Sequence, residues 1–260
     1  MSSMRSLLFV GHPGHELRVF GWLRSARPLT CVLTDGSGRS GRPRLEATRQ
    51  TLHETGAVPG PIFGAFTDAA LYAALLAGET RPFVDLADRL AGLIVDQGVS
   101  LVAGDAAEGY NPSHDVCRLL LDAAVDRARR RGAEVANFEF PLIDRSDECP
   151  PQARGLAIEI RLGDDELGAK LRAARREPDL AADVDEALGR FGADAFRVEV
   201  LRPVPEGREG DGLPDEPPFY ERHGTRRVRD GKYHQVIRRR DHILPLAGAL
   251  RSPELVGTAR

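Results

Sequence analysis

The sequence predicts an α/β fold, a Rossmann-like and mostly parallel sheet with helices on both faces, followed by a C-terminal extension. Over residues 5–142, short apolar runs alternate with longer segments whose apolar residues recur at helical spacing, a pattern typical of βαβ units. The chain has 260 residues, of which 42% are hydrophobic and 29% charged, enough for a full hydrophobic core. We therefore expect a Rossmann-like metal-binding domain over residues 1–145 and an extension over 146–260 that completes a substrate pocket.

The expected elements of the first region follow one another with clear turn signals between them. Strands are predicted at residues 6–10, 29–34, 62–66, 99–103 and 134–142, and helices at 17–23, 43–55, 84–97 and from 114 to about 129. Gly56 and Gly98 follow two of the helices, as glycine commonly does at a helix end. A polar loop starts at Thr67.

After residue 143 the pattern changes. A polar connector at 144–152 is followed by helices at 164–176 and 180–191, a strand at 196–201 and a long loop at 203–218. The tail suggests a β-hairpin with strands at 226–228 and 233–237, because Asp230-Gly231 is a favoured hairpin turn.

Composition and charge exclude several classes of function. With 36 basic and 39 acidic residues, the formal net charge of −3 gives no electrostatic case for nucleic acid or an anionic membrane. The sequence contains neither an apolar run of membrane-spanning length nor a signal peptide, so we expect a cytoplasmic protein. Cys31, Cys117 and Cys149 are few and far apart, which fits a reduced compartment without a disulfide framework.

The loop after the first strand carries two histidines, in His12-Pro-Gly-His15-Glu16. Neutral imidazole is the commonest protein metal ligand, and zinc accepts three protein ligands while keeping one position for water. A third histidine, His114, begins the helix after the fourth strand. Because ligand sites of parallel sheets collect at the carboxyl ends of the strands, the three could converge on one metal ion. The alternative is that they are ordinary loop and helix-start residues.

Two segments together resemble the PIG-L/LmbE family of zinc-dependent de-N-acetylases. Residues 12–16 stand where that family has His-Pro-Asp-Asp-Glu, and Asn111-Pro-Ser-His114 stands where it has His-Pro-Asp-His. The resemblance implies a zinc ion held by His12, His15 and His114, with an imidazole at 15 in place of the family's carboxylate.

The acid–base residues depart from the family pattern. Gly14 occupies the place of the family's general base, and glycine cannot accept a proton. The acidic residues in or beside the two loops that could replace the base are Glu16, Asp105, Glu108 and Asp115, among which we favour Glu108 and Asp105. Asn111 could donate a hydrogen bond to a developing oxyanion, and His234, or His223, could protonate the leaving amine.

The resemblance implies a hydrolase, specifically an amidohydrolase that removes an N-acetyl group from an amino sugar or similar amine. Asp35, Arg44 and Asp68 are candidates for binding sugar hydroxyls. Two alternatives stay open because of Gly14: altered, non-deacetylase zinc chemistry, and ligand binding without catalysis. The oligomeric state, homo-oligomer included, also stays open.

Two other patterns offer rival interpretations. The loop Gly36-Ser-Gly-Arg-Ser-Gly41 matches the G-x-G-x-x-G pattern of nucleotide-binding domains, although it follows the second strand and has no acidic residue about 20 positions later. Cys117, three residues after His114, could ligate a metal, but a small core residue in the apolar stripe of that helix is the simpler interpretation.

Overall fold

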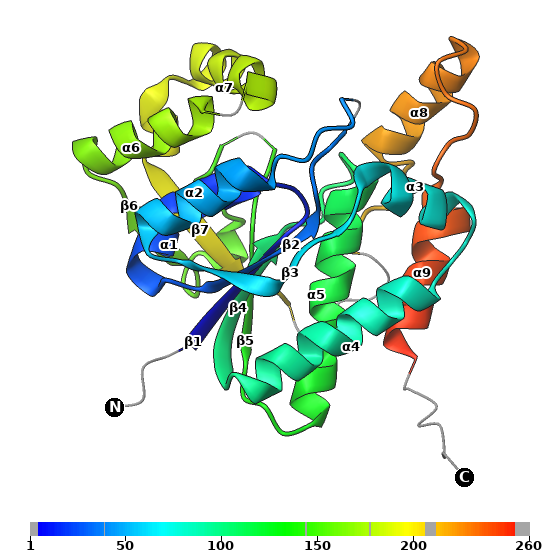
Figure 1. The fold of residues 1–260 in the computed structure, drawn as a ribbon, viewed down its shortest axis with the longest axis horizontal. Helices are drawn as coiled ribbons and strands as arrows, with labels where there is room; N and C mark the ends of the chain where they lie inside the picture. Colours follow the sequence, from blue (N-terminus) through cyan, green and yellow to red (C-terminus); the bar gives the residue numbers. More distant parts are fainter. Residues whose placement is uncertain (1–4, 39, 144, 177, 206–211, 253–260) are drawn as a thin grey trace.

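The computed structural model describes residues 5–38, 40–143, 145–176, 178–205 and 212–252. Within these residues, seven strands form one sheet in the order β3-β2-β1-β4-β5-β7-β6 (Figure 1). The strands are β1 (Arg5–Val10), β2 (Leu29–Thr34), β3 (Val58–Phe66), β4 (Val99–Asp105), β5 (Ala136–Phe140), β6 (Ile158–Arg161) and β7 (Val198–Pro203). Strands β1 to β5 are parallel, whereas β7 runs antiparallel to β5, and β6 antiparallel to β7. The predicted α/β class with a mostly parallel sheet is confirmed.

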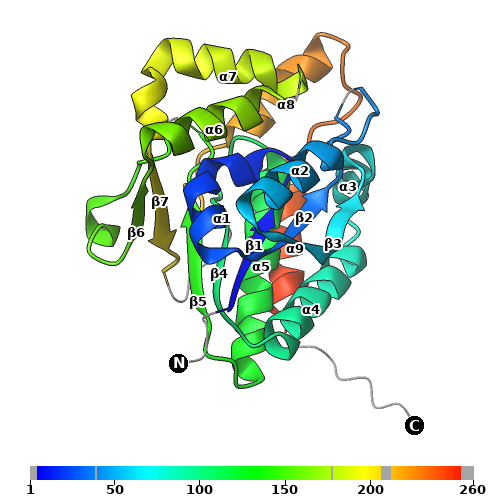
Figure 2. The ribbon, with the colours of Figure 1, turned by 60° about the vertical axis from the view of Figure 1, so that its left-hand side comes forward.

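Helices cover both faces of this sheet. They are α1 (Phe20–Ala26), α2 (Leu45–Thr55), α3 (Asp68–Leu76), α4 (Arg81–Asp96), α5 (Pro112–Arg130), α6 (Asp164–Arg175), α7 (Pro178–Phe191), α8 (Phe219–Arg229) and α9 (Leu244–Arg251). Short 3-10 turns occur at η1 (His15–Val19), η2 (Pro151–Ala153) and η3 (Ala193–Phe196), and a π-helical turn at η4 (Arg239–Ile243). Helices α4, α5 and α9 lie together on one side of the sheet and α1 and α2 on the other (Figures 1 and 2).

Strand β1 shows why the sheet needs both helical layers. Leu7 and Phe9 belong to the core shared with α3, α4, α5 and α9, whereas Leu8 and Val10 belong to the core shared with α1 and α2. All four side chains are fully buried. Because successive strand residues point to opposite faces, an unbroken apolar run is what a doubly covered central strand requires.

The region after residue 145 continues the same sheet. Strand β7 pairs with β5, and the Glu199 side chain on β7 accepts hydrogen bonds from the backbone N–H groups of Gly21 and Trp22 in the first turn of α1. Lys170 Nζ on α6 lies 2.9 Å from Glu199 Oε1, and both side chains are buried. The Glu199 carboxylate on β7 therefore connects α1 and α6. Helices α6 and α7 lie across the end of the molecule above α1 and α2 (Figure 2).

The predicted hairpin in the tail is wrong. Residues 219–229 form α8, whose Tyr220 and Gly224 are buried one helical turn apart. Pro218 precedes the helix and Gly231, with φ of 68°, follows it, so Asp230-Gly231 ends a helix instead of turning a hairpin. The prediction relied on the Asp-Gly dipeptide, which occurs both in hairpin turns and at the C-terminal ends of helices.

Three further elements were not predicted, namely α3, β6 and α9. Helix α3 begins where we expected a loop, because the Thr67 side chain accepts a hydrogen bond from the Ala70 N–H and caps the helix. Parts of three predicted segments lie outside the described residues: residue 39 of the glycine loop, residue 144 of the connector and residues 206–211 of the long loop. No helix among the described residues has the length and apolar character needed to cross a membrane.

Candidate active site

The candidate site lies at the carboxyl ends of β1, β2 and β4, where α5 begins. Asn111 is the N-cap of α5, and its Oδ1 accepts a hydrogen bond from the Ser113 N–H at 3.0 Å. This cap places His114 in the first turn of α5, facing the loop after β1. The position agrees with the rule that sites of parallel sheets gather beyond the carboxyl ends of their strands.

The structure brings the imidazoles of His12, His15 and His114 together. The ring centroid of His12 lies 5.2 Å from that of His15 and 5.3 Å from that of His114, and the His15 and His114 centroids are 4.6 Å apart. His12 and His114 are each only 8% exposed. Three histidines from two distant segments therefore share one small, largely buried space.

Carboxylates stand behind two of these rings. His12 Nδ1 lies 2.7 Å from Thr34 Oγ1 and 3.2 Å from Asp68 Oδ1, and His15 Nδ1 lies 2.8 Å from Asp105 Oδ2. A carboxylate on one ring nitrogen is the usual way to orient a histidine whose other nitrogen binds a metal.

The remaining ring nitrogens show that the cluster is not arranged as a formed metal site. His12 Nε2 lies 2.9 Å from Ser113 Oγ, and the buried His114 Nδ1 has no hydrogen-bond partner among the residues that the structure describes. Among the residues that the structure describes, no group of three or more His, Cys, Asp or Glu side chains could hold a metal ion as it stands.

Burial sets the protonation of this cluster. Burial lowers the pKa of His15 and of His114 well below the usual value, and the neighbouring imidazoles lower each further. Burial alone would raise the pKa of Asp68, but its interactions with His12, with the Thr34 hydroxyl and with the Gly38 N–H together outweigh that effect and hold the pKa well below its usual range. The cluster thus favours neutral His15 and His114 beside an ionised Asp68.

Asp105 is fully buried at the end of β4. Its Oδ2 accepts the Gly11 N–H at 2.7 Å in addition to contacting His15, and its Oδ1 has no hydrogen-bond partner within the described part of the chain. Burial raises the pKa of Asp105 to about 7, although the Gly11 N–H opposes the rise. A Cβ at Gly11 would approach Asp105 Oδ2 to 2.8 Å, so this close approach depends on glycine.

Gly14, where the sequence resemblance implied a general base, lies against an apolar side chain. Gly14 has φ of 101°, a conformation that L residues rarely adopt, and a Cβ there would overlap Leu180 Cδ1 of α7. Glu16 Oε2 accepts the Gly14 N–H at 2.7 Å, and burial raises the Glu16 pKa. Sequence reasoning missed Leu180, because nothing local links α7 to residue 14.

The Glu108 side chain accepts hydrogen bonds from the backbone that follows β5. Its Oε2 accepts the N–H groups of Leu142 and Ile143 at 3.0 and 3.1 Å, tying the loop after β4 to the end of β5. Burial raises its pKa to about 7, against the effect of these two N–H groups. Asp115 Oδ1 accepts the N–H groups of Glu108 and Gly109, each at 3.1 Å, and so stabilises the same loop.

The side-chain oxygen of Asn111 accepts three hydrogen bonds within the protein. Its Oδ1 accepts from Tyr72 Oη at 3.0 Å and from Ser113 Oγ at 2.7 Å, as well as from the Ser113 N–H. The side-chain NH₂ is the donor that remains. Sequence reasoning missed Tyr72 because it lies on α3, where a loop was expected.

The predicted sugar-binding residues shape the loop after β2. Asp35 Oδ1 accepts the Ser37 N–H at 2.9 Å, Arg44 Nε donates to Gly36 O at 2.6 Å, and Asp68 Oδ2 accepts the Gly38 N–H. Because carboxylates already bind the N–H groups of Ser37 and Gly38, these two groups are not free to bind a phosphate. The glycine loop therefore offers little support for a nucleotide-binding domain.

The structure gives three further candidates, His234, His223 and Cys117, surroundings that differ from those of the three imidazoles. His234 is exposed in the segment between α8 and η4, and His223 stacks on Phe219 with centroids 5.6 Å apart. Cys117 is fully buried in the apolar core, its Sγ 3.7 Å from Phe9 O, and burial raises the pKa of the thiol. These contacts favour the interpretation of Cys117 as a core residue.

Comparison with solved structures finds proteins of similar fold. A deacetylase of the teicoplanin biosynthesis pathway matches with a TM-score of 0.52 at 15% identity, covering 77% of this chain and 97% of its own. The A40926 pseudoaglycone deacetylase Dbv21 matches with a TM-score of 0.48 at 16% identity, covering 78% and 97%, and the conserved protein TT1542 from Thermus thermophilus with 0.47 at 18% identity, covering 78% and 95%. No protein-family model and no curated protein matches the sequence. At these identities the first likeness shows the fold alone: this chain has the α/β fold of a deacetylase.

Proposed function

We propose that this protein is a cytoplasmic zinc-dependent deacetylase of the PIG-L/LmbE kind, which removes the N-acetyl group of an amino sugar or similar amine. One observation carries the proposal: three imidazoles from two distant segments gather within centroid distances of 4.6 to 5.3 Å at the carboxyl edge of the sheet. The deacetylase of teicoplanin biosynthesis, whose fold is similar, agrees with this type of reaction.

The donor chemistry of His12, His15 and His114 fits zinc. Two of the rings have carboxylates at Nδ1, and His114 Nδ1 is buried without a hydrogen-bond partner among the described residues. Because buried polar atoms usually have a partner, this unpaired nitrogen supports a bound ligand. Occupation would require the Ser113 hydroxyl to release His12 Nε2. Bound zinc would lower the pKa of its water toward ~7 and polarise the acyl carbonyl.

The protein's own groups would move the protons. We assign the role of proton acceptor first to Asp105, because its Oδ1 has no hydrogen-bond partner and its Oδ2 contacts His15. Glu108 is the second candidate, since its Oε2 is already bound by two backbone N–H groups. The Asn111 NH₂ group would donate to the carbonyl oxygen, and His234 would protonate the departing amine.

The extension at 146–260 would complete the pocket. Leu180 of α7 packs over Gly14, which supports a lid from this region above the imidazoles. We keep Asp35, Arg44 and Asp68 as candidates for binding sugar hydroxyls, with Asp68 also orienting His12.

The test is metal content and deacetylase activity of wild type and His114→Ala, with His53→Ala as a matched control because His53 is exposed on α2. We expect about one zinc per chain in wild type and in His53→Ala, following the three-ligand zinc sites of other hydrolases. His114→Ala should lose the metal and the release of acetate together. Retention of zinc by His114→Ala at wild-type affinity would show that the ligand assignment is wrong.

Ligand binding without catalysis is the second candidate, and the Gly14–Leu180 contact favours it, because an apolar side chain covers the usual base position. Zinc-loaded wild type that binds N-acetylglucosamine but releases no acetate would support this candidate over the deacetylase.

A further inference from the structure

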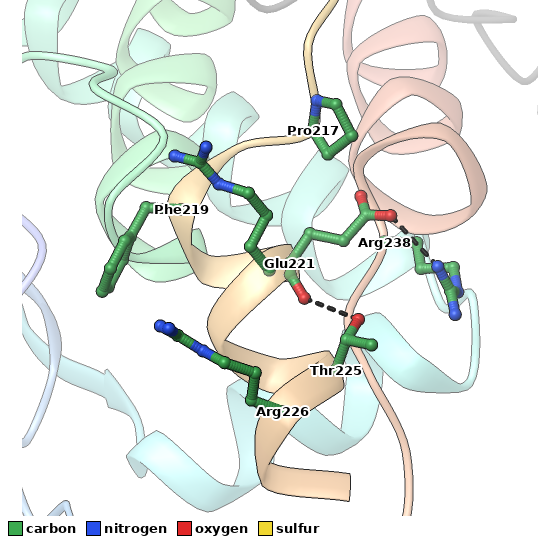
Figure 3. Close-up of a pocket in the computed structure, with 7 residues that line it drawn as sticks. Pro217, Phe219, Glu221, Thr225, Arg226 and Arg238 are labelled. Atoms are coloured by element: carbon green, nitrogen blue, oxygen red, sulfur yellow. Dashed lines mark hydrogen bonds and ion pairs between the residues drawn. The ribbon is translucent and has the colours of Figure 1, made fainter. Parts of the chain in front are cut away.

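An open pocket of about 700 Å³ lies along α8 (Figure 3). It is lined by Pro217, Phe219, Glu221, Arg222, Thr225, Arg226 and Arg238. In Figure 3 the side chain of Arg226 extends on the side of α8 that carries Phe219, and the Glu221–Arg238 pair lies on the other side.

The charge of this pocket is unbalanced. Its one carboxylate, Glu221, is already engaged, by Arg238 Nη1 at 3.1 Å and by the Arg239 N–H at 3.0 Å. Within the described part of the chain, the guanidinium groups of Arg222 and Arg226 make no hydrogen bond or ion pair, and both residues are exposed. Like charges four residues apart on a helix repel one another, so an anion held between them would relieve the repulsion.

The pocket adjoins the loop that carries Asn111. The Phe219 ring stacks on Tyr110 with centroids 4.9 Å apart and an interplanar angle of 4°, and the Tyr220 N–H donates to Gly109 O at 3.3 Å. Tyr110 is 46% exposed and Phe219 36% exposed. A molecule whose amide lies at Asn111 could therefore extend across Tyr110 toward the two arginines.

We propose that Arg222 and Arg226 bind an anionic group, a phosphate or a carboxylate, on the amine portion of the substrate. The inference rests on the proposed deacetylase function and narrows its substrate to an N-acetylated sugar or amine that carries such a group. Guanidinium is suited to the role because its planar fork binds both anions through charge-assisted, often bidentate, hydrogen bonds.

Calorimetric binding tests the pocket without requiring turnover. The probes are N-acetylglucosamine 1-phosphate for the phosphate source, N-acetylmuramic acid for the carboxylate source, and neutral N-acetylglucosamine. We expect at least one charged probe to bind wild type roughly tenfold more tightly than the neutral sugar, the scale of a charge-assisted hydrogen bond. The charged probe that gains more identifies the natural anion.

The variant Arg222→Gln/Arg226→Gln should lose this advantage. The control Arg89→Gln/Arg229→Gln changes the net charge equally at two exposed arginines outside the pocket and should keep it. Equal binding of charged and neutral probes by wild type, or the same loss in both double variants, would overturn the proposal.

Acetate release separates this inference from the proposed function. If wild type hydrolyses the probes, Arg222→Gln/Arg226→Gln should raise KM for the charged probe and leave kcat and the neutral probe unaffected. If no probe is hydrolysed while the charge-dependent binding persists, the deacetylase function fails and the anion site stands. An unchanged KM for the charged probe in that variant contradicts the anion site.

Discussion

The two halves of the candidate site are built differently. On the imidazole half, Asp68 and Asp105 contact the Nδ1 atoms of His12 and His15, so charged and polar groups hold the rings in place. On the other half, Gly14 lies against the apolar Leu180. The comparison teaches that one short loop can hold two side chains by polar contacts while its neighbouring residue packs against an apolar side chain.

The largest expected effect concerns the imidazole half. Asp68→Asn keeps the shape of the side chain but leaves a single acceptor oxygen for the Gly38 N–H and for His12 Nδ1. Under the proposed zinc function, the affinity for zinc should fall about 10–100-fold, as when other carboxylates behind metal-bound histidines are changed. Chelator competition measures it.

Asp85→Asn is the matched control, because Asp85 is an exposed carboxylate on α4. Equal zinc affinities of Asp68→Asn and Asp85→Asn would mean that Asp68 does not orient a ligand.

The next effect tests the covered half. Gly14→Ala should lower the free energy of unfolding by roughly 2 kcal/mol, because alanine is strained at φ of 101° and its Cβ overlaps Leu180. Urea unfolding measures it. Adding Leu180→Ala should remove the steric overlap but leave the backbone strain. The two substitutions should therefore show a coupling of about 0.5–2 kcal/mol in a double-mutant cycle.

Strict additivity of Gly14→Ala and Leu180→Ala would show that α7 does not pack on residue 14 in solution. The same cycle guides any attempt to restore a base: Gly14→Asp should be tested together with Leu180→Ala, since the single variant meets both penalties.

The smallest effect is a pH dependence at Glu108. Burial raises its pKa in the folded protein to about 7, from 4.5, so between these values the folded state binds more protons than the unfolded chain. Raising the pH through this window should therefore reduce stability, by roughly 1–2 kcal/mol after allowing for partial exposure. Glu108→Gln, which keeps an acceptor for both N–H groups, should lack this contribution.

The measurement is the difference between wild type and Glu108→Gln in urea unfolding at pH 5 and pH 8. The difference isolates Glu108 from His15 and His114, whose lowered pKa values act in the opposite direction and reduce stability as the pH falls. Glu79→Gln, at an exposed position, controls for the loss of a glutamate. A difference that does not change with pH would contradict the raised pKa.

The sequence predicted the order of the strands and helices of the first region except for α3, and it indicated that His12, His15 and His114 could meet. Apolar runs such as Ser6–Val10 and the stripe of α5 carry their own periodicity, and the parallel βαβ rule alone places their following loops at one edge. These predictions need only local pattern and a general rule of topology.

Only the tertiary structure decided what surrounds those histidines. Leu180 over Gly14, Tyr72 on Asn111, and Asp68 behind His12 join segments far apart in the chain, and α8 replaced a hairpin because Tyr220 and Gly224 bury one helical face. A local pattern does not encode which distant side chain fills a given space. Packing and burial settle that, and in this protein they cover one half of the site with an apolar side chain and orient the rings of the other half with carboxylates.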